Sequence, residues 1–376
     1  MARLGDVCII NPKTPVIDDN LTVSFIPMPK VGENGEFDAS EIKEYREVKK
    51  GFTYFQNGDV LFAKITPCME NGKGAIARML ENGIGFGSTE FHVLRPKDGN
   101  VLSKWIYYLL SWSNFRKEAE NNMTGSAGQK RVPKSFLENY NVMLPPLEKQ
   151  KNQIDSLAKI DDVITLRKQQ LSKLDELVKS RFIELFSSVE DEDSLINLCT
   201  FIDYRGKTPE KTESGLPFIT AKNVKMHHMS FDTQEFISKE TYDKVMTRGF
   251  PRIGDVVFTT EAPLGNVCRI PYIETEFYIG QRIITMQTEL LEPAYLEYAL
   301  SSDNFKRKIT EKSSGSTVTG IRSKLLEQLT IPVPPRALQE EFAAFVEQVD
   351  ESKFEVQKSL EKFETLKKAL MQKYFG

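Results

Sequence analysis

The chain repeats one series of short motifs in its two halves. Four pairs of segments match in type and in order, and the distance between the copies falls only from 196 residues to 189 along the series. The matching pairs are residues 58–63 (GDVLFA) and 254–259 (GDVVFT), 109–116 (LLSWSNFR) and 299–306 (ALSSDNFK), 125–126 (GS) and 315–316 (GS), and 144–146 (LPP) and 333–335 (VPP). So few insertions separate the copies that the halves must fold alike. Two similar units suit a target with two separated half-sites.

The length and the repeat together predict four segments. A chain of 376 residues is too long for one ordinary core. Short apolar runs bounded by Gly, Pro and Asn indicate a mixed α/β (α+β) unit in each half. The expected segments are a first globular unit at 1–144, a long helix at 145–190, a second globular unit at 191–335 and a second long helix at 336–376.

The two predicted helices carry an apolar seam with spacings of three and four residues. The seam residues are Leu157, Ile160, Ile164, Leu171, Leu174, Val178, Val349, Val356, Leu360, Phe363 and Leu370. A single helix of this length cannot bury such a seam alone. We expect the two helices to pair as an antiparallel coiled coil; the alternatives are that each lies on its own globular unit, or that they drive homodimerisation.

The sequence lacks the motifs of the common enzyme classes. Residues 206–208 (GKT) have the tail of a phosphate-binding loop, but Phe201 stands where its first glycine is needed. The alternating Gly83, Gly85 and Gly87 are typical of a hairpin or a strand edge. The Pro-Pro pairs lack the flanking residues of an amino-methyltransferase tetrapeptide and are typical of helix starts. We therefore expect no catalysis by this chain.

Metal binding and membrane insertion are not expected either. The adjacent His227 and His228 should point to opposite faces of a strand, without further ligands at metal-binding spacing. No run of about 18 apolar residues occurs. The four cysteines form no CxxC pair, so a reducing cytoplasm is the expected location.

Two matching loops are the strongest candidates for DNA contacts. Residues 125–134 contain three positive charges, no acid and two glycines, and residues 315–324 are similar. Small, hydroxylated and cationic residues suit contacts with phosphates. The net charge of −3 means that such contacts must come from local loops. The alternative is that each loop is a solvated linker without a binding role.

Further candidates lie outside these loops, because Arg can fork onto guanine and Asn onto adenine. The complete set of predicted DNA-contacting residues is Lys64, Thr66, Lys73, Gly125, Ser126, Gln129, Lys130, Arg131, Lys134, Arg205, Lys207, Thr208, Lys222, Asn223, Gln281, Arg282, Ser316, Thr317, Thr319, Arg322 and Lys324.

Several short motifs follow one another in the same order in both halves. They are the openings at 4–8 (LGDVC) and 195–199 (LINLC), the GDV strands, Asn-Phe at 114–115 and 304–305, the Gly-Ser loops, and 144–150 (LPPLEKQ) and 333–339 (VPPRALQ); further motifs are 206–209 (GKTP), 215–219 (GLPFI) and 280–284 (GQRII). In these motifs and their order, the chain resembles the DNA-specificity subunits of type I restriction–modification systems. The resemblance covers the whole chain, and its strength is that the order occurs twice.

This resemblance implies that each globular unit is a target-recognition domain that reads one half of a bipartite DNA site. The two helices would hold the spacing and bind two methyltransferase subunits. Those subunits would carry S-adenosylmethionine, and restriction subunits would use ATP and Mg²⁺. Residues 336–338 (RAL) depart from the usual helix start. The first unit has no close copy of the Lys-Thr-Pro stretch, so its base-reading residues are less defined.

Three other functions stay open at this stage. The chain could be the specificity subunit of a restriction class whose methylation and cleavage share one polypeptide. It could be a coiled-coil scaffold for proteins, which predicts no salt-dependent affinity for duplex DNA. A self-sufficient methyltransferase would bind S-adenosylmethionine by itself, but the missing motifs disfavour it.

Overall fold

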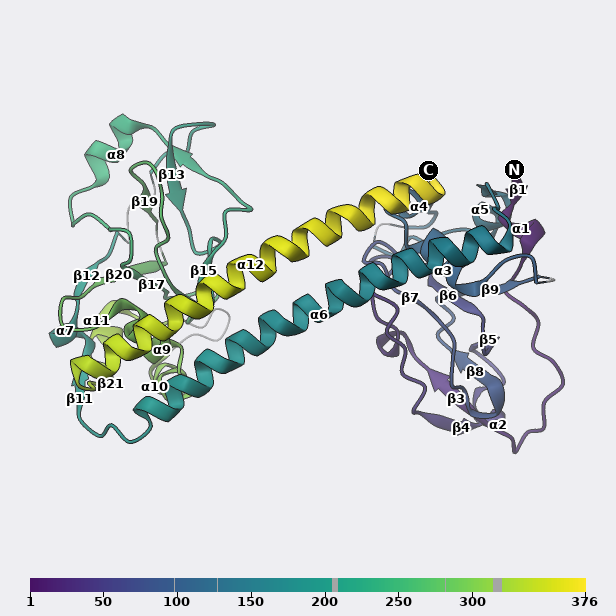
Figure 1. The fold of residues 1–376 in the computed structure, drawn as a ribbon, viewed down its shortest axis with the longest axis horizontal. Helices are drawn as coiled ribbons and strands as arrows, with labels where there is room; N and C mark the ends of the chain where they lie inside the picture. The colour runs from purple at the N-terminus through teal and green to yellow at the C-terminus, as the bar shows by residue number, and fades with distance from the viewer. Residues whose placement is uncertain (98, 127, 205–208, 281, 314–319) are drawn as a thin grey trace. The chain divides into compact units, whose positions relative to one another are not determined.

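The computed structural model describes residues 1–97, 99–126, 128–204, 209–280, 282–313 and 320–376. Its contacts divide the chain into two units (Figure 1). The first unit combines Met1–Lys168 with Lys358–Gly376, and the second is Gln169–Gln357. Each unit therefore contains one globular α/β part and a segment of both long helices.

The globular part of the first unit is built on two four-stranded sheets. One has the order β2 (Cys8–Ile10), β9 (Phe91–Pro96), β6 (Val60–Ala63), β7 (Gly74–Ile76), all antiparallel. The other has the order β4 (Ile42–Glu44), β3 (Thr22–Ile26), β8 (Ile84–Gly87), β5 (Thr53–Gln56), in which β3 and β8 are parallel. All four residues of β6 are buried, which explains its unbroken apolar sequence.

The glycines of β8 are required by close packing. A Cβ atom on Gly85 would lie 2.2 Å from the ring of Phe55, and one on Gly87 would lie 2.2 Å from the carbonyl oxygen of Ile26. The alternating glycines are thus strand residues that admit a neighbouring ring and backbone.

Short helices and strands complete the first unit. The fully buried Trp105 of α3 and the buried Phe115 of α4 pack in the same core as β6 and β9. The remaining elements are β1 (Ala2–Arg3), α1 (Leu4–Val7), η1 (Met28–Lys30), α2 (Tyr45–Val48), η2 (Glu81–Gly83), α3 (Ser103–Ser111), α4 (Ser113–Asn121), α5 (Lys134–Asn139) and β10 (Asn141–Val142).

The second unit repeats the central sheet of the first. Its strands β12 (Thr200–Ile202), β20 (Ile283–Gln287), β17 (Val256–Thr259) and β18 (Val267–Arg269) have the same order and the same antiparallel pairing as β2, β9, β6 and β7. The sequence repeat is therefore a repeat of structure.

The rest of the second unit departs more from the first. A three-stranded sheet has the order β16 (Phe236–Ile237), β13 (Leu216–Ile219), β19 (Tyr278–Ile279), with β13 and β19 parallel. The other elements are β11 (Glu192–Ser194), α7 (Leu195–Leu198), β14 (Val224–Lys225), β15 (His228–Met229), α8 (Lys239–Val245), α9 (Pro293–Ser301), α10 (Asp303–Lys312), α11 (Ser323–Glu327) and β21 (Thr330–Pro332).

The long helices are α6 (Leu147–Phe186) and α12 (Arg336–Phe375). In the first unit their segments pair in opposite directions, since Asp161 and Lys168 of α6 form ion pairs with Lys367 and Glu364 of α12 at 2.6 and 3.5 Å. The ring of Phe375 lies 5.2 Å from that of Trp105. Here the helices thus pack on each other and on the globular part.

The second unit shows the same arrangement with the helix ends exchanged (Figure 1). Asp175 and Arg181 of α6 pair with Lys353 and Glu341 of α12, each at 2.5 Å. The ring of Phe342 lies within 5.5 Å of Phe182 and Phe186, and Phe186 also meets Tyr295 of α9. The expected α/β fold with paired antiparallel helices is confirmed, and packing on the globular part accompanies the pairing.

Every predicted seam residue is at least half-buried. The buried ones are Leu157, Ile160, Val178, Val349, Val356 and Leu360; Ile164, Leu171, Leu174, Phe363 and Leu370 are partly buried. Among the described residues, no helix is both long enough and apolar enough to cross a membrane.

The aromatic core of the second unit gives a first test. Replacing the fully buried Phe342 with Ala should lower the free energy of unfolding by about 3–5 kcal/mol, because a ring surrounded by three others is lost. Phe354→Ala, on the same helix but 65% exposed, is the matched control and should change it by less than about 1 kcal/mol. The measurement is the urea midpoint by circular dichroism, and equal shifts for both variants would contradict this packing.

Candidate nucleic-acid interface

The first unit brings two of the predicted DNA-contacting segments together at the end of β6. Ile65 forms a β-bridge with Arg131. On either side of it, the Thr66 N–H donates to the carbonyl of Lys130 at 3.0 Å, and the Val132 N–H donates to that of Lys64 at 2.9 Å. The loop after β6 and the end of the Gly-Ser loop therefore form one surface.

The second unit has the same junction after β17. Glu261 forms a β-bridge with Gly320, and the Ile321 N–H donates to the carbonyl of Thr260 at 3.0 Å. These residues stand at the repeat positions of Ile65, Arg131, Val132 and Lys64. The two halves thus hold equivalent loops by equivalent backbone contacts.

Backbone geometry makes the first Gly-Ser loop tight. Gly125 and Gly128 have φ values of +123° and +79°. A Cβ on Gly125 would lie 2.9 Å from the carbonyl oxygen of Gln129. The Gln129 N–H donates to the carbonyl of Ser126 at 3.0 Å. Ser126, Gln129 and Lys130 are exposed in this loop.

A buried histidine anchors the end of this loop to the sheet. The Nε2 of His92, on β9, lies 2.8 Å from the carbonyl oxygen of Val132, and its Nδ1 lies 3.1 Å from the side-chain nitrogen of Asn11. With the Asn11 amide donating to Nδ1, Nε2 carries the proton and donates to Val132. Burial lowers the pKa of His92, which favours this neutral form.

Arg131 is held by a carboxylate in the first unit. Its Nε and Nη2 each donate to Glu90 at 2.9 Å, and Nη1 donates to the carbonyl of Gln129 at 3.0 Å. The hydrogen bond from Arg131 is the largest influence on Glu90 and holds the pKa of that carboxyl below its usual value. Nearby, burial lowers the pKa of half-buried Lys64.

In the second unit, Arg282 stands at the position of Glu90. Its Nε lies 2.8 Å from Oε1 of Glu261, and its backbone has φ +70°. The Thr260 N–H donates to the carbonyl of Arg282 at 2.8 Å, as the Lys64 N–H donates to that of Glu90 at 2.9 Å. Arg282 therefore stands at the position of Glu90, whereas its acidic partner Glu261 stands at the position of Ile65 and not at that of Arg131.

Other predicted contacts are more peripheral. Lys73 donates to the carbonyl of Met28 at 3.4 Å, and Lys134 pairs with Glu138 one turn along α5 at 2.9 Å. Exposed Arg322 and Lys324 flank the start of α11. Thr66 donates its hydroxyl to Glu70 at 2.8 Å.

Asn223 is buried, although we expected it to read a base. Its amide nitrogen donates to the carbonyls of Ser230 and Thr233 at 3.0 and 2.8 Å, and its oxygen accepts from the Thr220 N–H at 2.9 Å. Only 4% of the residue is exposed. In this structure its amide therefore holds a turn. The adjacent Lys222 is exposed, with Glu235 at 3.8 Å.

Seven predicted contacts lie outside the described residues. They are Arg205, Lys207, Thr208, Gln281, Ser316, Thr317 and Thr319.

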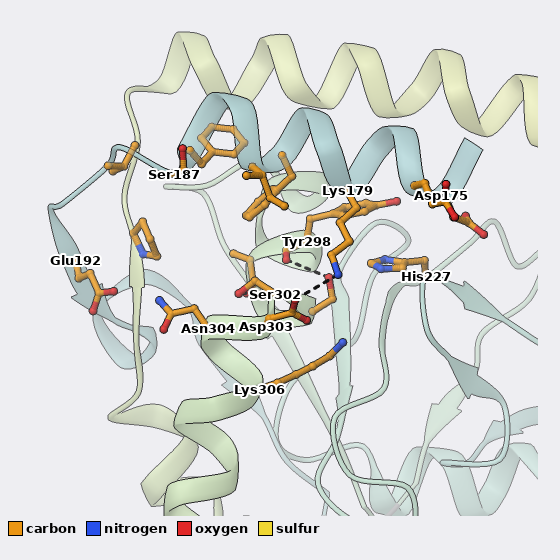
Figure 2. A pocket seen from close by; sticks show the side chains of 18 of the residues that line it. Asp175, Lys179, Ser187, Glu192, His227, Tyr298, Ser302, Asp303, Asn304 and Lys306 are labelled. Atoms are coloured by element: carbon orange, nitrogen blue, oxygen red, sulfur yellow. Dashed lines mark hydrogen bonds and ion pairs between the residues drawn. The ribbon is translucent and has the colours of Figure 1, made fainter. Parts of the chain in front are cut away.

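A pocket of about 570 Å³ lies in the second unit, between the end of α6 and helices α9 and α10. Figure 2 shows Lys179 and Asp303 pointing toward each other across it, at 3.3 Å, beside Tyr298 and His227. None of the described candidate DNA contacts lines this pocket. It is a feature of the helix junction, separate from the loop surface.

The sequence reasoning missed a charged network beside that pocket. Glu297 of α9 is almost fully buried, accepts from Nε of Arg269 at 2.6 Å and lies 2.8 Å from Nδ1 of His227. Arg269 also pairs with Asp350 of α12 at 2.8 Å. The sequence contains one indication of this network, namely the single acidic residue Glu297 inside the apolar run 294–300. The network ties the β14–β15 hairpin to α9 and α12.

His227 and His228 do not form part of a metal site in the described structure. His227 stacks on Tyr298 with ring centroids 4.2 Å apart, whereas exposed His228 lies on β15. Within the described ranges, no group of three or more His, Cys, Asp or Glu side chains is placed to hold a metal ion.

The structural role of Asn223 can be tested directly. Asn223→Ala should destabilise the fold by about 1–3 kcal/mol, because it leaves buried backbone groups without partners. The exposed Lys222→Ala is the control and should leave the melting temperature nearly unchanged. If Asn223→Ala melts as the wild type but changes DNA preference, Asn223 reads a base after all.

The Glu90–Arg131 pair predicts a pH-dependent stability. The pKa of Glu90 is lower in the folded state than its ordinary value of 4.5, so the stabilisation is complete above that value and is lost as the pH falls through the folded pKa. Glu90→Gln should therefore melt below the wild type at about pH 6, and the difference should shrink as the pH falls below 4.5. Thermal melts at several pH values measure this, and a difference that does not vary with pH would be the contrary result.

Two solved structures have a fold similar to that of this chain. Its fold matches a chain from a structure of type I R-M complex assembly and conformational transition (TM-score 0.60, 20% identity, 99% of this chain and 96% of that one). It also matches the type I restriction-modification system S subunit from M. genitalium (TM-score 0.58, 15% identity, 100% and 95%). At these identities the matches show the fold.

Sequence relatives match parts of the chain. The EcoAI specificity subunit of Escherichia coli is 47% identical over 176 residues, which are 46% of this chain and 30% of that protein. The EcoEI specificity subunit of Escherichia coli is 39% identical over 208 residues, or 54% and 35%. The chain therefore spans about a third of the length of these two relatives.

The family model of the type I restriction modification DNA specificity domain matches residues 1–176 and 196–364, one stretch in each half. With both halves of the repeat covered, the chain belongs to the type I restriction modification DNA specificity domain family.

Proposed function

We propose that this chain is the DNA specificity subunit of a type I restriction–modification complex and that it recognises a bipartite site in duplex DNA. The observation that carries the proposal is the match of one DNA specificity domain in each half, together with the equivalent loop junction in each unit. Each unit would read one half-site.

The charge distribution supports local contacts with DNA. The chain has a net charge of −3, yet the loop at 125–134 contains Lys130, Arg131 and Lys134 and no acid. Cations on an exposed, glycine-bearing turn contact phosphates well, and phosphate contacts set the register from which bases are read. In the second unit, Arg282, Arg322 and Lys324 are the described exposed cations near the equivalent junction.

The long helices support the binding of two copies of one partner. Leu177 of α6 and Leu366 of α12 stand at equivalent positions, 189 residues apart like the helix starts, and each belongs to a different unit. They are 48% and 45% exposed. An exposed leucine repeated in this way offers the same contact twice, which suits two methyltransferase subunits.

In this function the chain itself is not an enzyme. The methyltransferase subunits would bind S-adenosylmethionine and methylate adenine, and restriction subunits would use ATP and Mg²⁺. All would act on DNA in the cytoplasm. Continuity of α6 and α12 through both units would keep the number of base pairs between the half-sites constant.

The test is to co-express the chain with the genes beside its own and to map N6-methyladenine in the host DNA. We expect methylation in a split motif with one fixed gap, which would name both half-sites. A strain that carries only the neighbouring genes is the control and should lack this motif. A short continuous motif, or unchanged methylation, would overturn the proposal.

Binding of the purified full chain to duplex DNA at low and high salt separates this function from a protein scaffold. Phosphate contacts release counterions, so affinity should fall steeply as salt rises. A scaffold would show no duplex affinity at either concentration.

A further inference from the structure

We propose that each unit reads one guanine through an arginine that a carboxylate holds in place: Arg131 in the first unit and Arg282 in the second. This inference rests on the proposed function and adds to it the base and the residue that reads it in each half-site.

The two pairs lie at the same junction and share one equivalent position, that of Glu90 and Arg282. Glu90 directly precedes β9 and Arg282 directly precedes β20, and the carbonyls of both accept from the strand-end loop. In the first unit the arginine comes from the Gly-Ser loop, whereas in the second unit the acid, Glu261, comes from the loop after β17. What recurs is therefore an arginine with a carboxylate partner at this junction, and not a residue type at one sequence position.

The geometry of Arg131 leaves its outer edge suited to guanine. Glu90 occupies Nε and one N–H of Nη2, and the carbonyl of Gln129 occupies one N–H of Nη1. A guanidinium has five N–H groups, so one remains on each terminal nitrogen. Donors on the two terminal nitrogens can reach the O6 and N7 acceptors of guanine in the major groove. Glu90 thus fixes the plane of the donor pair.

The backbone of Arg282 gives a separate indication of a binding role, because it lies in the left-handed region at φ +70°. That conformation is uncommon for a residue with a Cβ, and such strain concentrates at binding sites. Nε of Arg282 lies 2.8 Å from Oε1 of Glu261, so this acid holds the guanidinium as Glu90 holds that of Arg131. The side chain is 55% exposed.

Stability alone accounts poorly for these pairs. The side chains of the two pairs are 24–55% exposed, and ion pairs in contact with solvent contribute little to stability. An arginine–carboxylate pair at the same junction of both units, although the partner comes from a different loop in each, favours a role in recognition. The carboxylate also repels phosphate, so it directs the arginine toward a base edge and away from the DNA backbone.

The test uses the full chain, purified from co-expression with its neighbouring genes, and a randomised duplex library as the probe. The wild type should select a split motif with at least one G·C pair in each half. Arg131→Ala should reduce the preference for one G·C pair in one half-site by roughly 5- to 150-fold and leave the other half unchanged. Arg282→Ala should do the same in the opposite half.

Two further sets of variants separate base reading from other roles. Arg131→Lys and Arg282→Lys keep the charge and should retain affinity at low salt while the G·C preference falls. Arg95→Lys in the first unit and Arg269→Lys in the second change arginines whose carboxylate partners, Asp59 and Glu297, are buried. These controls should lower the melting temperature without changing any base preference.

The outcomes distinguish this inference from the proposed function. A wild type that selects a split motif, with arginine variants that lose affinity uniformly or relax no single position, would overturn the guanine assignment alone. A half-site without G·C would overturn it for that unit. A wild type that selects no sequence would sink the proposed function and this inference with it.

Discussion

The packing of α6 and α12 on each other and on the globular part of each unit is the constraint on which the rest of the structure depends. A helix of 40 residues with an apolar seam must cover that seam. In the second unit Phe186 and Phe342 share one core with Tyr295 of α9, and in the first Phe375 packs on Trp105 of α3. Because α3 and α9 pack against β6 and β17, the loops that follow these strands are anchored to the core that the helices complete.

The features predicted from the sequence were those with a local signal. The long helices follow from an apolar period without Gly or Pro and from the Pro-Pro pairs before them, and the repeat follows from matching motifs. Contacts distant in sequence had no such signal. Glu90 and Arg131 are 41 residues apart, and Glu297 meets a histidine 70 residues away. Asn223 looked like a base reader because its type is right for adenine, but only the fold reveals that its amide closes a turn.

The two units share similar apolar packing but differ in the charged contacts around it. Asp161 of α6 and Asp350 of α12 stand at equivalent repeat positions. The first accepts from Tyr108 and pairs with Lys367, whereas the second pairs with Arg269, which also holds the buried Glu297. Burial of apolar surface sets the architecture, so a pair of polar partners can be replaced within it as long as no buried charge loses its partner. In the proposed function, such replacement would let the two halves of one frame recognise different sequences.

The small net charge of the chain also fits a function that depends on a few local charged side chains. Screening confines the attraction between a surface cation and a phosphate to about 10 Å, so in the proposed function the cations of one loop would act on DNA independently of the total charge. A strongly basic surface would instead bind every duplex and reduce the advantage of the correct site. A chain with a net charge of −3 gains little from non-specific attraction. In the proposed function, its selectivity would then come from a few side chains held in fixed positions, and an arginine held by a carboxylate on a sheet-anchored loop would meet that requirement.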